Sequence, residues 1–167
     1  MKNALSLMSL AAVAVAGGIA FTTLSSAQNS EPSVRTDTSA AEQVADSRQI
    51  TMWRSPGCGC CDAWGEYMEE AGYTVKTIDD PAFDRTAISV GVPEQGLGCH
   101  LAKVGDYFVS GLVPADVIDR LLKELPDIAG ITLPGMPGNA PGMASEKTGT
   151  LKTYAFGPDG IAVYFDG

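Results

Sequence analysis

The pattern of hydrophobic and polar positions predicts a strand, a helix and a second strand early in the folded part of the chain. Residues 49–54 ("QITMWR") are typical of a strand, and residues 73–78 ("YTVKTI") are rich in β-branched side chains. Between them, residues 60–71 carry apolar side chains at helical spacing, and Gly72 is typical of the residue that follows a helix. These apolar side chains are Ala63, Trp64, Tyr67, Met68 and Ala71.

The pattern then predicts a short helix, a hairpin and an amphipathic helix. Residues 84–89 favour the short helix. Residues 101–110 hold two strand-like segments around Gly105 and Asp106, which form the signature of a two-residue hairpin turn. Residues 114–126 begin and end with proline and carry an apolar stripe at helical spacing, so they predict the amphipathic helix.

The last third of the chain predicts an irregular segment and a final hairpin. Residues 133–145 ("LPGMPGNAPGMAS") are too rich in glycine and proline for a regular element. Residues 150–156 and 161–167 flank a Gly-Pro-Asp-Gly turn, which predicts a C-terminal β-hairpin. The order of elements is that of a thioredoxin-like domain. We therefore predict an α/β fold, a thioredoxin-like domain with an added C-terminal β-hairpin.

The N-terminal third predicts a signal and a spacer ahead of this domain. Residues 4–21 carry no charge, follow Lys2 and precede small residues that end at Ala27, which is typical of a secretory signal peptide over residues 1–27. A retained membrane anchor is the alternative, because the apolar run is almost long enough to span a bilayer. Residues 28–48 offer almost nothing to bury and predict a disordered tether.

The folded domain is therefore expected over residues 49–167, in the periplasm once the signal is cleaved and without membrane insertion. The formal net charge of −9 excludes nucleic acid and anionic membrane surfaces as partners. It suits a soluble protein that binds cations.

Thiols crowd the loop that joins the first strand to the first helix. Cys58, Cys60 and Cys61 lie within "GCGCCD", and Cys99 precedes His100, the single histidine of the chain. Backbone N–H groups at a helix start favour a thiolate over a thiol, so cysteines there are expected to ionise easily. Ionised sulfur is both a nucleophile and a metal ligand.

Two disulfide-based interpretations of these thiols meet difficulties. A purely structural framework needs partners that are distant in sequence, yet three of the four cysteines lie within one tetrapeptide. A thiol-disulfide oxidoreductase would use Cys58-x-x-Cys61 at the helix start. In that enzyme Cys60 would compete in every exchange step, but the interpretation stays open as the alternative.

A metal site uses all the unusual residues together. Cys58, Cys60, Cys61 and Cys99 offer four sulfur donors, and soft sulfur selects Cu(I), Zn(II) or an iron–sulfur cluster. The vicinal Cys-His pair suits tetrahedral zinc poorly, whereas thiolates can bridge several cuprous ions. His100 is expected at the rim of such a site.

Several other residues are candidates for a role near this site. Met136 and Met143 lie in the glycine- and proline-rich segment, where thioether ligands and simple gap fillers are both open. Trp53 and Trp64 are expected to pack in the core, and Arg54 is expected to be a surface charge.

Three stretches of the chain resemble the CopG-like family of periplasmic copper-resistance and metal-binding proteins, long known only as a domain of unknown function. The stretches are "MWRSPGCGCCDAWGEYMEEAGYTV", "GVPEQGLGCHLAKVGDYFVSGLVPADVIDRLL" and "ITLPGMPGNAPGM". The C-x-C-C motif after a strand and the downstream C-H pair are the marks that carry the resemblance.

The resemblance implies a thioredoxin-like protein that binds copper and takes part in copper resistance and homeostasis. The implied ligands are Cys58, Cys60 and Cys61 of C-x-C-C and Cys99 and His100 of C-H. It also implies interconversion of Cu(I) and Cu(II) as an activity beside copper binding, and whether the protein is an enzyme stays open. A copper exporter or another periplasmic copper carrier is the implied protein partner.

Overall fold

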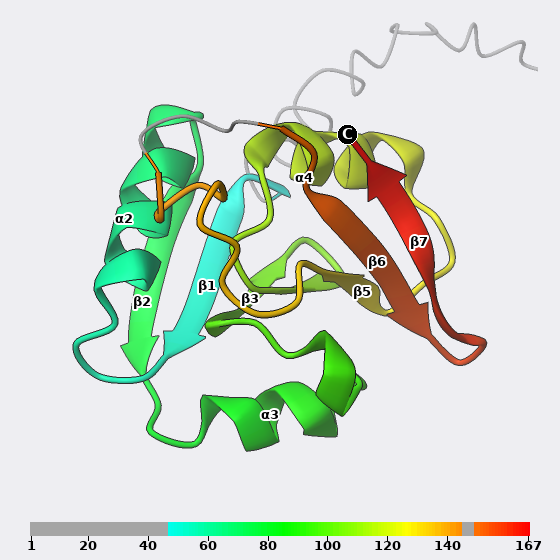
Figure 1. Ribbon diagram of the computed structural model, residues 1–167, viewed down its shortest axis with the longest axis horizontal. Helices are drawn as coiled ribbons and strands as arrows, with labels where there is room; N and C mark the ends of the chain where they lie inside the picture. The colour runs from blue at the N-terminus through cyan, green and yellow to red at the C-terminus, as the bar shows by residue number, and fades with distance from the viewer. Residues whose placement is uncertain (1–46, 145–148) are drawn as a thin grey trace, which may run out of the picture. The chain divides into compact units, whose positions relative to one another are not determined.

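The computed structural model describes residues 47–144 and 149–167, a mixed α/β arrangement with one seven-stranded sheet and three α-helices in that part of the chain (Figure 1). The strand order is β2-β1-β3-β4-β5-β6-β7. The predicted signal peptide and all but the last two residues of the predicted tether lie outside the described residues. No described helix is long and apolar enough to cross a membrane.

The first strand, helix and second strand form where the sequence predicts them. β1 (Gln49–Arg54) pairs in parallel with β2 (Thr74–Asp79), and α2 (Gly59–Glu70) connects them. Trp64 and Met68 on the apolar stripe of α2 are completely buried. The predicted strand and helix boundaries are confirmed to within one residue.

The next elements extend the sheet on the other side of β1. After α3 (Phe83–Ser89) and a 3-10 turn, η1 (Glu94–Gly96), the chain enters β3 (His100–Val104). β3 pairs antiparallel with β1 and, through the predicted two-residue turn, with β4 (Tyr107–Ser110). The short helix and this hairpin are therefore confirmed.

A strand that the sequence pattern did not predict follows the amphipathic helix. α4 (Ala115–Glu124) leads to β5 (Gly130–Thr132), which pairs in parallel with β4. β5 has only three residues and begins with glycine, so its two β-branched residues form too short a run to mark it as a strand. Residues 130–132 form a strand because their backbone pairs with β4 on one side and with β6 on the other.

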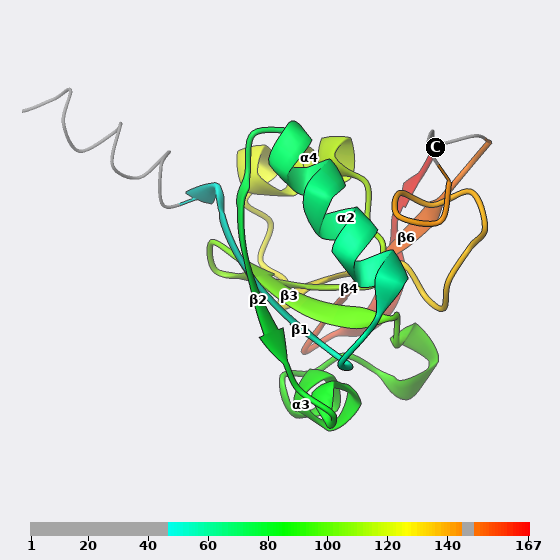
Figure 2. The same ribbon diagram turned by 90° about the vertical axis from the view of Figure 1, so that its left-hand side faces the viewer.

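Two apolar layers cover the sheet. Side chains of α2 and α4 share the larger core with β1 residues such as Met52, whereas Ala87 of α3 packs with Leu101 and Phe156 in a second cluster. Figure 2 shows α2 and α4 on one face of the sheet and α3 on the other.

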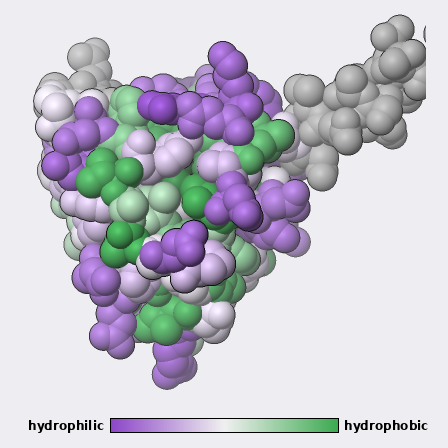
Figure 3. Space-filling view, turned by 90° about the vertical axis from the view of Figure 1, so that its right-hand side faces the viewer, coloured by the Kyte–Doolittle hydropathy of each residue, from purple (hydrophilic) through white to green (hydrophobic). Residues whose placement is uncertain are grey.

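The C-terminal edge of the sheet is formed by β6 (Lys152–Gly157) and β7 (Gly160–Asp166), which pair antiparallel. Ile161 and Val163 of β7 are exposed apolar residues. They line a shallow pocket of about 490 Å³ together with Gln95, Pro134, Tyr154 and Ala162. Figure 3, viewed from this side of the molecule, shows apolar patches between polar ones.

Replacing Gly130 with alanine is expected to destabilise the fold, because β5 approaches β4 closely at this point. A Cβ atom at residue 130 would meet the backbone carbonyl of Phe108 and the ring of Phe156. Overpacking of this kind costs about 1–3 kcal/mol or more. Urea denaturation of Gly130→Ala measures the loss in free energy of unfolding.

The matched control is Gly138→Ala, because a Cβ atom there meets nothing within 4 Å. Equal midpoints for the two variants would contradict the close approach of β5 to β4.

Candidate metal centre

Four cysteine side chains converge at one end of the sheet. Cys58 is the N-cap of α2, Cys60 and Cys61 lie in its first turn, and Cys99 directly precedes β3. Their sulfur atoms all lie within 4.8 Å of one another. The register of the sheet explains this meeting, because Arg54 at the end of β1 lies opposite His100 at the start of β3.

Cys58 and Cys61 are joined by a disulfide, and Cys60 and Cys99 remain thiols. The helix start sets the Cα atoms of the bonded pair 5.3 Å apart, a separation that suits a disulfide. Cys60 Sγ lies 3.5 Å from Cys58 Sγ. The thiol that distinguishes this motif from a simple C-x-x-C therefore contacts the bonded pair.

Cys99 and His100 form the other side of the cluster. Burial raises the pKa of the Cys99 thiol, and the neighbouring Cys60 raises it further through charge repulsion and a hydrogen bond. His100 Nδ1 lies 3.4 Å from Cys99 Sγ. Burial lowers the pKa of His100 to about 3, so its imidazole is neutral near pH 7.

The position of His100 differs from the expectation that it stands at the rim. Its side chain is completely buried, and its ring lies 4.4 Å from the ring of Trp64, between centroids. Trp64 in turn donates a hydrogen bond from its indole N–H to the Val113 carbonyl. Among the described residues, no hydrogen-bond partner meets His100 Nε2. The His100 ring packs against Trp64 in the core, and this tertiary contact is not visible in the sequence.

Arg54 is another residue that the sequence interpretation placed wrongly. Its side chain is only 13% exposed and forms ion pairs with Asp62 of α2 at 3.0 Å and Asp79 of β2 at 3.5 Å. It also donates a hydrogen bond to the Ser55 carbonyl. Arg54 thus ties both ends of the cysteine loop to the sheet. The two carboxylates belong to α2 and β2, so no pattern within β1 signals these ion pairs.

A buried polar contact holds the segment that carries Cys99. Gly96 O accepts hydrogen bonds from the hydroxyls of Ser110 and Thr132, and Ser110 Oγ accepts one from Gly98 N–H at 3.0 Å. Gly98 also packs so closely on Gly111 that a Cβ atom would clash with its backbone. Through these contacts, Ser110 of β4 and Thr132 of β5 fix the position of the segment that leads to Cys99.

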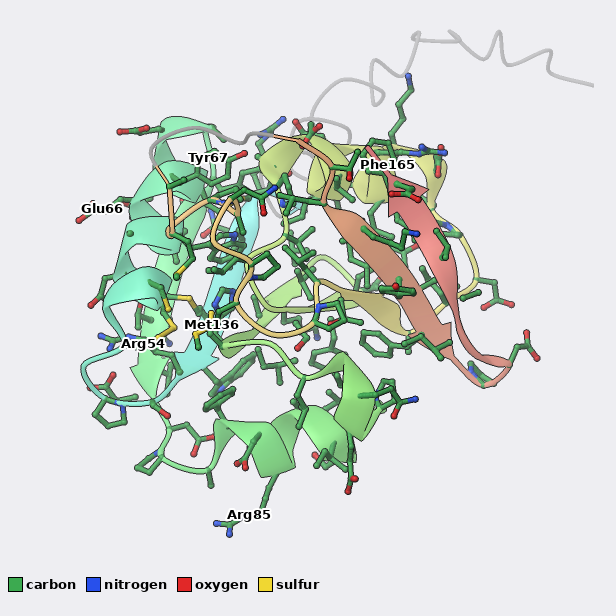
Figure 4. The ribbon with its side chains drawn as sticks, viewed as in Figure 1. Arg54, Glu66, Tyr67, Arg85, Met136 and Phe165 are labelled. Atoms are coloured by element: carbon green, nitrogen blue, oxygen red, sulfur yellow. A yellow bond between two sulfur atoms is a disulfide. The ribbon has the colours of Figure 1, made fainter. Side chains whose placement is uncertain are left out.

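The glycine- and proline-rich segment lies against the cluster. Gly135 N–H donates to the Leu97 carbonyl at 2.9 Å, and Gly135 pairs with Gly98, which places Met136 beside the Cys99 segment. Met136 is 59% exposed, and its side chain lies near the sulfur atoms in the view of Figure 4.

The other end of this segment reaches α2. Gly142 packs against the Cys60 carbonyl and the Trp64 backbone, and the neighbouring Met143 is 44% exposed. Each methionine thus directly follows a glycine that contacts one of the cysteine-bearing segments. The sequence predicted an irregular segment here but did not predict where it lies.

Comparison with known proteins identifies relatives of this chain. The family model described as "Protein of unknown function, DUF411" matches residues 97–143, which include Cys99 and His100. Two solved structures named copper resistance protein CopG also match, form 2 at 29% identity and TM-score 0.65 and form 1 at 30% and 0.64. Each match covers 71% of this chain, and 97% and 96% of the respective relative. No curated protein matches the chain.

The fold and the site together define a small α/β protein with four clustered cysteine sulfurs, a group that could hold a metal ion once the Cys58–Cys61 disulfide is reduced. The chain belongs to the CopG-like copper-resistance family. The resemblance drawn from the C-x-C-C and C-H motifs is confirmed.

Removing the Thr132 hydroxyl is expected to loosen Cys99 without touching a sulfur atom. In Thr132→Val the buried Gly96 carbonyl loses one of its two hydroxyl donors and keeps the Ser110 hydroxyl, at a cost of about 0.5–1.5 kcal/mol. Opening of the segment and alkylation of the Cys99 thiol should then be faster by about twofold to tenfold. Timed iodoacetamide labelling with peptide mass spectrometry measures this rate.

Thr132→Ser keeps the hydroxyl and should label at the wild-type rate. The positioning role would be wrong if Thr132→Val labelled Cys99 no faster than Thr132→Ser does.

Proposed function

We propose that this protein binds copper as Cu(I) through the thiolates of Cys58, Cys60, Cys61 and Cys99 and acts in copper resistance. The observation that carries the proposal is the approach of four sulfur atoms to within 4.8 Å of one another. Thiolate sulfur is soft and selects Cu(I) over hard cations such as Mg²⁺. The names of the two solved relatives add support.

The proposed fold is thioredoxin-like, with β6 and β7 as the C-terminal hairpin. Support comes from the parallel β1-α2-β2 unit, the antiparallel β3–β4 pair and the packing of α2 and α4 on one face. The cysteine pair at the start of α2 fits this proposal.

The donor set favours more than one copper ion. Cu(I) accepts two or three sulfur ligands, and a thiolate can bridge two ions, so four thiolates suffice for a multinuclear cluster. We propose His100 as the nitrogen donor, because its neutral Nδ1 lies 3.4 Å from Cys99 Sγ. The exposed thioethers of Met136 and Met143 lie on the segment that flanks the sulfurs.

The Cys58–Cys61 disulfide supports a redox role for the same site. Two thiols that form a disulfide release two protons and two electrons, and the electrons reduce two Cu(II) to two Cu(I). A sulfur atom in a disulfide is no longer a thiolate ligand. Oxidation of the pair would therefore couple copper reduction to a change in copper affinity.

The same disulfide favours a second candidate, an extracytoplasmic thiol-disulfide oxidoreductase. That enzyme would use Cys58, which is partly exposed, to attack a protein disulfide and the buried Cys61 to resolve the mixed disulfide. Cys60 Sγ, at 3.5 Å from Cys58 Sγ, would compete with Cys61 in this step.

The proposed setting is the periplasm, reached through a cleaved signal peptide over residues 1–27 and with residues 28–48 as a tether. A copper exporter or another copper carrier is the proposed partner. The net charge of −9 speaks against nucleic acid.

Anaerobic titration of the reduced protein with Cu(I) against a competing chelator tests copper binding. We expect wild type to take up more than one ion. Cys60→Ser should lose affinity by more than the roughly 10–100-fold that loss of an outer-shell partner costs. Gly59→Ala is the matched control, because it alters the same loop, keeps every sulfur and places a Cβ atom in open space.

An insulin-reduction assay on the same variants separates the two candidates. Weak or single-ion copper uptake by wild type, together with rapid insulin reduction, would favour the oxidoreductase and end the copper proposal. Uptake that is unchanged in Cys60→Ser would remove Cys60 from the proposed ligands.

A further inference from the structure

Two thiols remain in the site after Cys58 and Cys61 have formed their disulfide. Cys60 and Cys99 are both partly buried, and they come from opposite sides of the cluster, the first turn of α2 and the segment before β3. The redox chemistry proposed for Cys58 and Cys61 does not use either of these two thiols.

These two thiols lie close to one another. Their sulfur atoms belong to the group of four that lie within 4.8 Å of one another. A disulfide requires sulfur atoms about 2.05 Å apart, so side-chain rotation must close a gap of less than about 3 Å. Cys60 and Cys99 are 39 residues apart along the chain, so a disulfide between them would not close a short, strained loop.

We propose that Cys60 and Cys99 are a second redox pair, which closes as a disulfide after Cys58–Cys61. The site then passes from four thiols to two and from two to none. In each step two S–H bonds break, one S–S bond forms, and two protons and two electrons leave. The electrons of each step reduce two Cu(II) to two Cu(I), and this part rests on the proposed copper function.

The two steps have different consequences for bound copper. With one disulfide, the state of this structure, Cys60 and Cys99 still offer two thiolates, which suffice for a two-coordinate Cu(I). With two disulfides, no cysteine thiolate remains, and Cu(I) loses its sulfur ligands. The second pair therefore sets the point at which the site releases its copper.

An alternative pairing within the cluster would use the short contact between Cys60 and Cys58. Their sulfur atoms lie 3.5 Å apart, which is close enough for internal exchange. A Cys58–Cys60 bond would close a ring with a single intervening residue, whereas Cys58–Cys61 spans the helix start at 5.3 Å between Cα atoms. The geometry thus favours Cys58–Cys61 with Cys60–Cys99.

Stepwise oxidation of the reduced full chain with diamide tests the second pair without copper. Alkylation and intact mass should report four, then two, then no free thiols, and peptide mapping should link Cys60 to Cys99. Size-exclusion chromatography should show that the oxidised chain stays monomeric. A chain that keeps two thiols in excess diamide, or that maps as Cys58–Cys60 with Cys61–Cys99, would overturn the proposal.

A variant that contains only the second pair gives the sharper result. In Cys58→Ser/Cys61→Ser we expect diamide to close Cys60–Cys99 within one chain, with circular dichroism confirming the fold. The further change Cys99→Ser leaves a single thiol and serves as the matched control. If the double variant keeps both thiols or forms only disulfide-linked dimers, Cys60 and Cys99 are not a redox pair and the proposal is wrong.

A Cu(II) titration separates this inference from the copper proposal. A chelator that colours with Cu(I) should count four reduced ions per reduced wild-type chain and two for Cys60→Ser/Cys99→Ser, a twofold difference. If diamide closes both disulfides but Cu(II) is not reduced, the second pair stands and the copper redox role fails. If wild type reduces only two ions, the second step does not serve copper and that part is wrong.

Discussion

Antiparallel pairing of β1 with β3 is the interaction on which the cysteine cluster depends. It sets Arg54 opposite His100, so the loop that leaves β1 and the segment that enters β3 meet at the same end of the sheet. Three cysteines arrive from one side and Cys99 from the other. Without this register the chain would have a C-x-C-C loop and a distant thiol but no four-sulfur site.

Contacts that involve no sulfur atom fix the two segments that carry the cysteines. Arg54 ties the cysteine loop to α2 and β2 through two carboxylates. On the other side, Ser110 and Thr132 hydrogen-bond the Gly96 carbonyl and so position the segment that leads to Cys99. A buried carbonyl such as that of Gly96 is costly to leave unpaired, so its hydrogen bonds restrict the segment before Cys99 to one place. The position of the Cys99 sulfur atom is restricted in turn.

The same four sulfur atoms can serve metal binding and disulfide chemistry, but one atom cannot do both at once. A thiolate has a lone pair for a soft metal, and a disulfide sulfur does not offer that ligand. Oxidation state therefore decides how many ligands the site presents. The neutral, buried His100 and the partly buried Cys99 lie at the inner side of the cluster, whereas Met136 and Met143 flank it from an exposed segment.

The sequence by itself determined most elements and singled out the cysteines of the cluster, because helical stripes, turn residues and the C-x-C-C motif are local patterns. β1, α2, β2, α3, the β3–β4 hairpin and α4 form where those patterns predict them. Only the tertiary structure decided that β5 is a strand, that Arg54 is half-buried and His100 fully buried, and that the methionine segment lies against the cysteines. These outcomes depend on contacts between residues far apart in the chain, and no local pattern encodes such contacts.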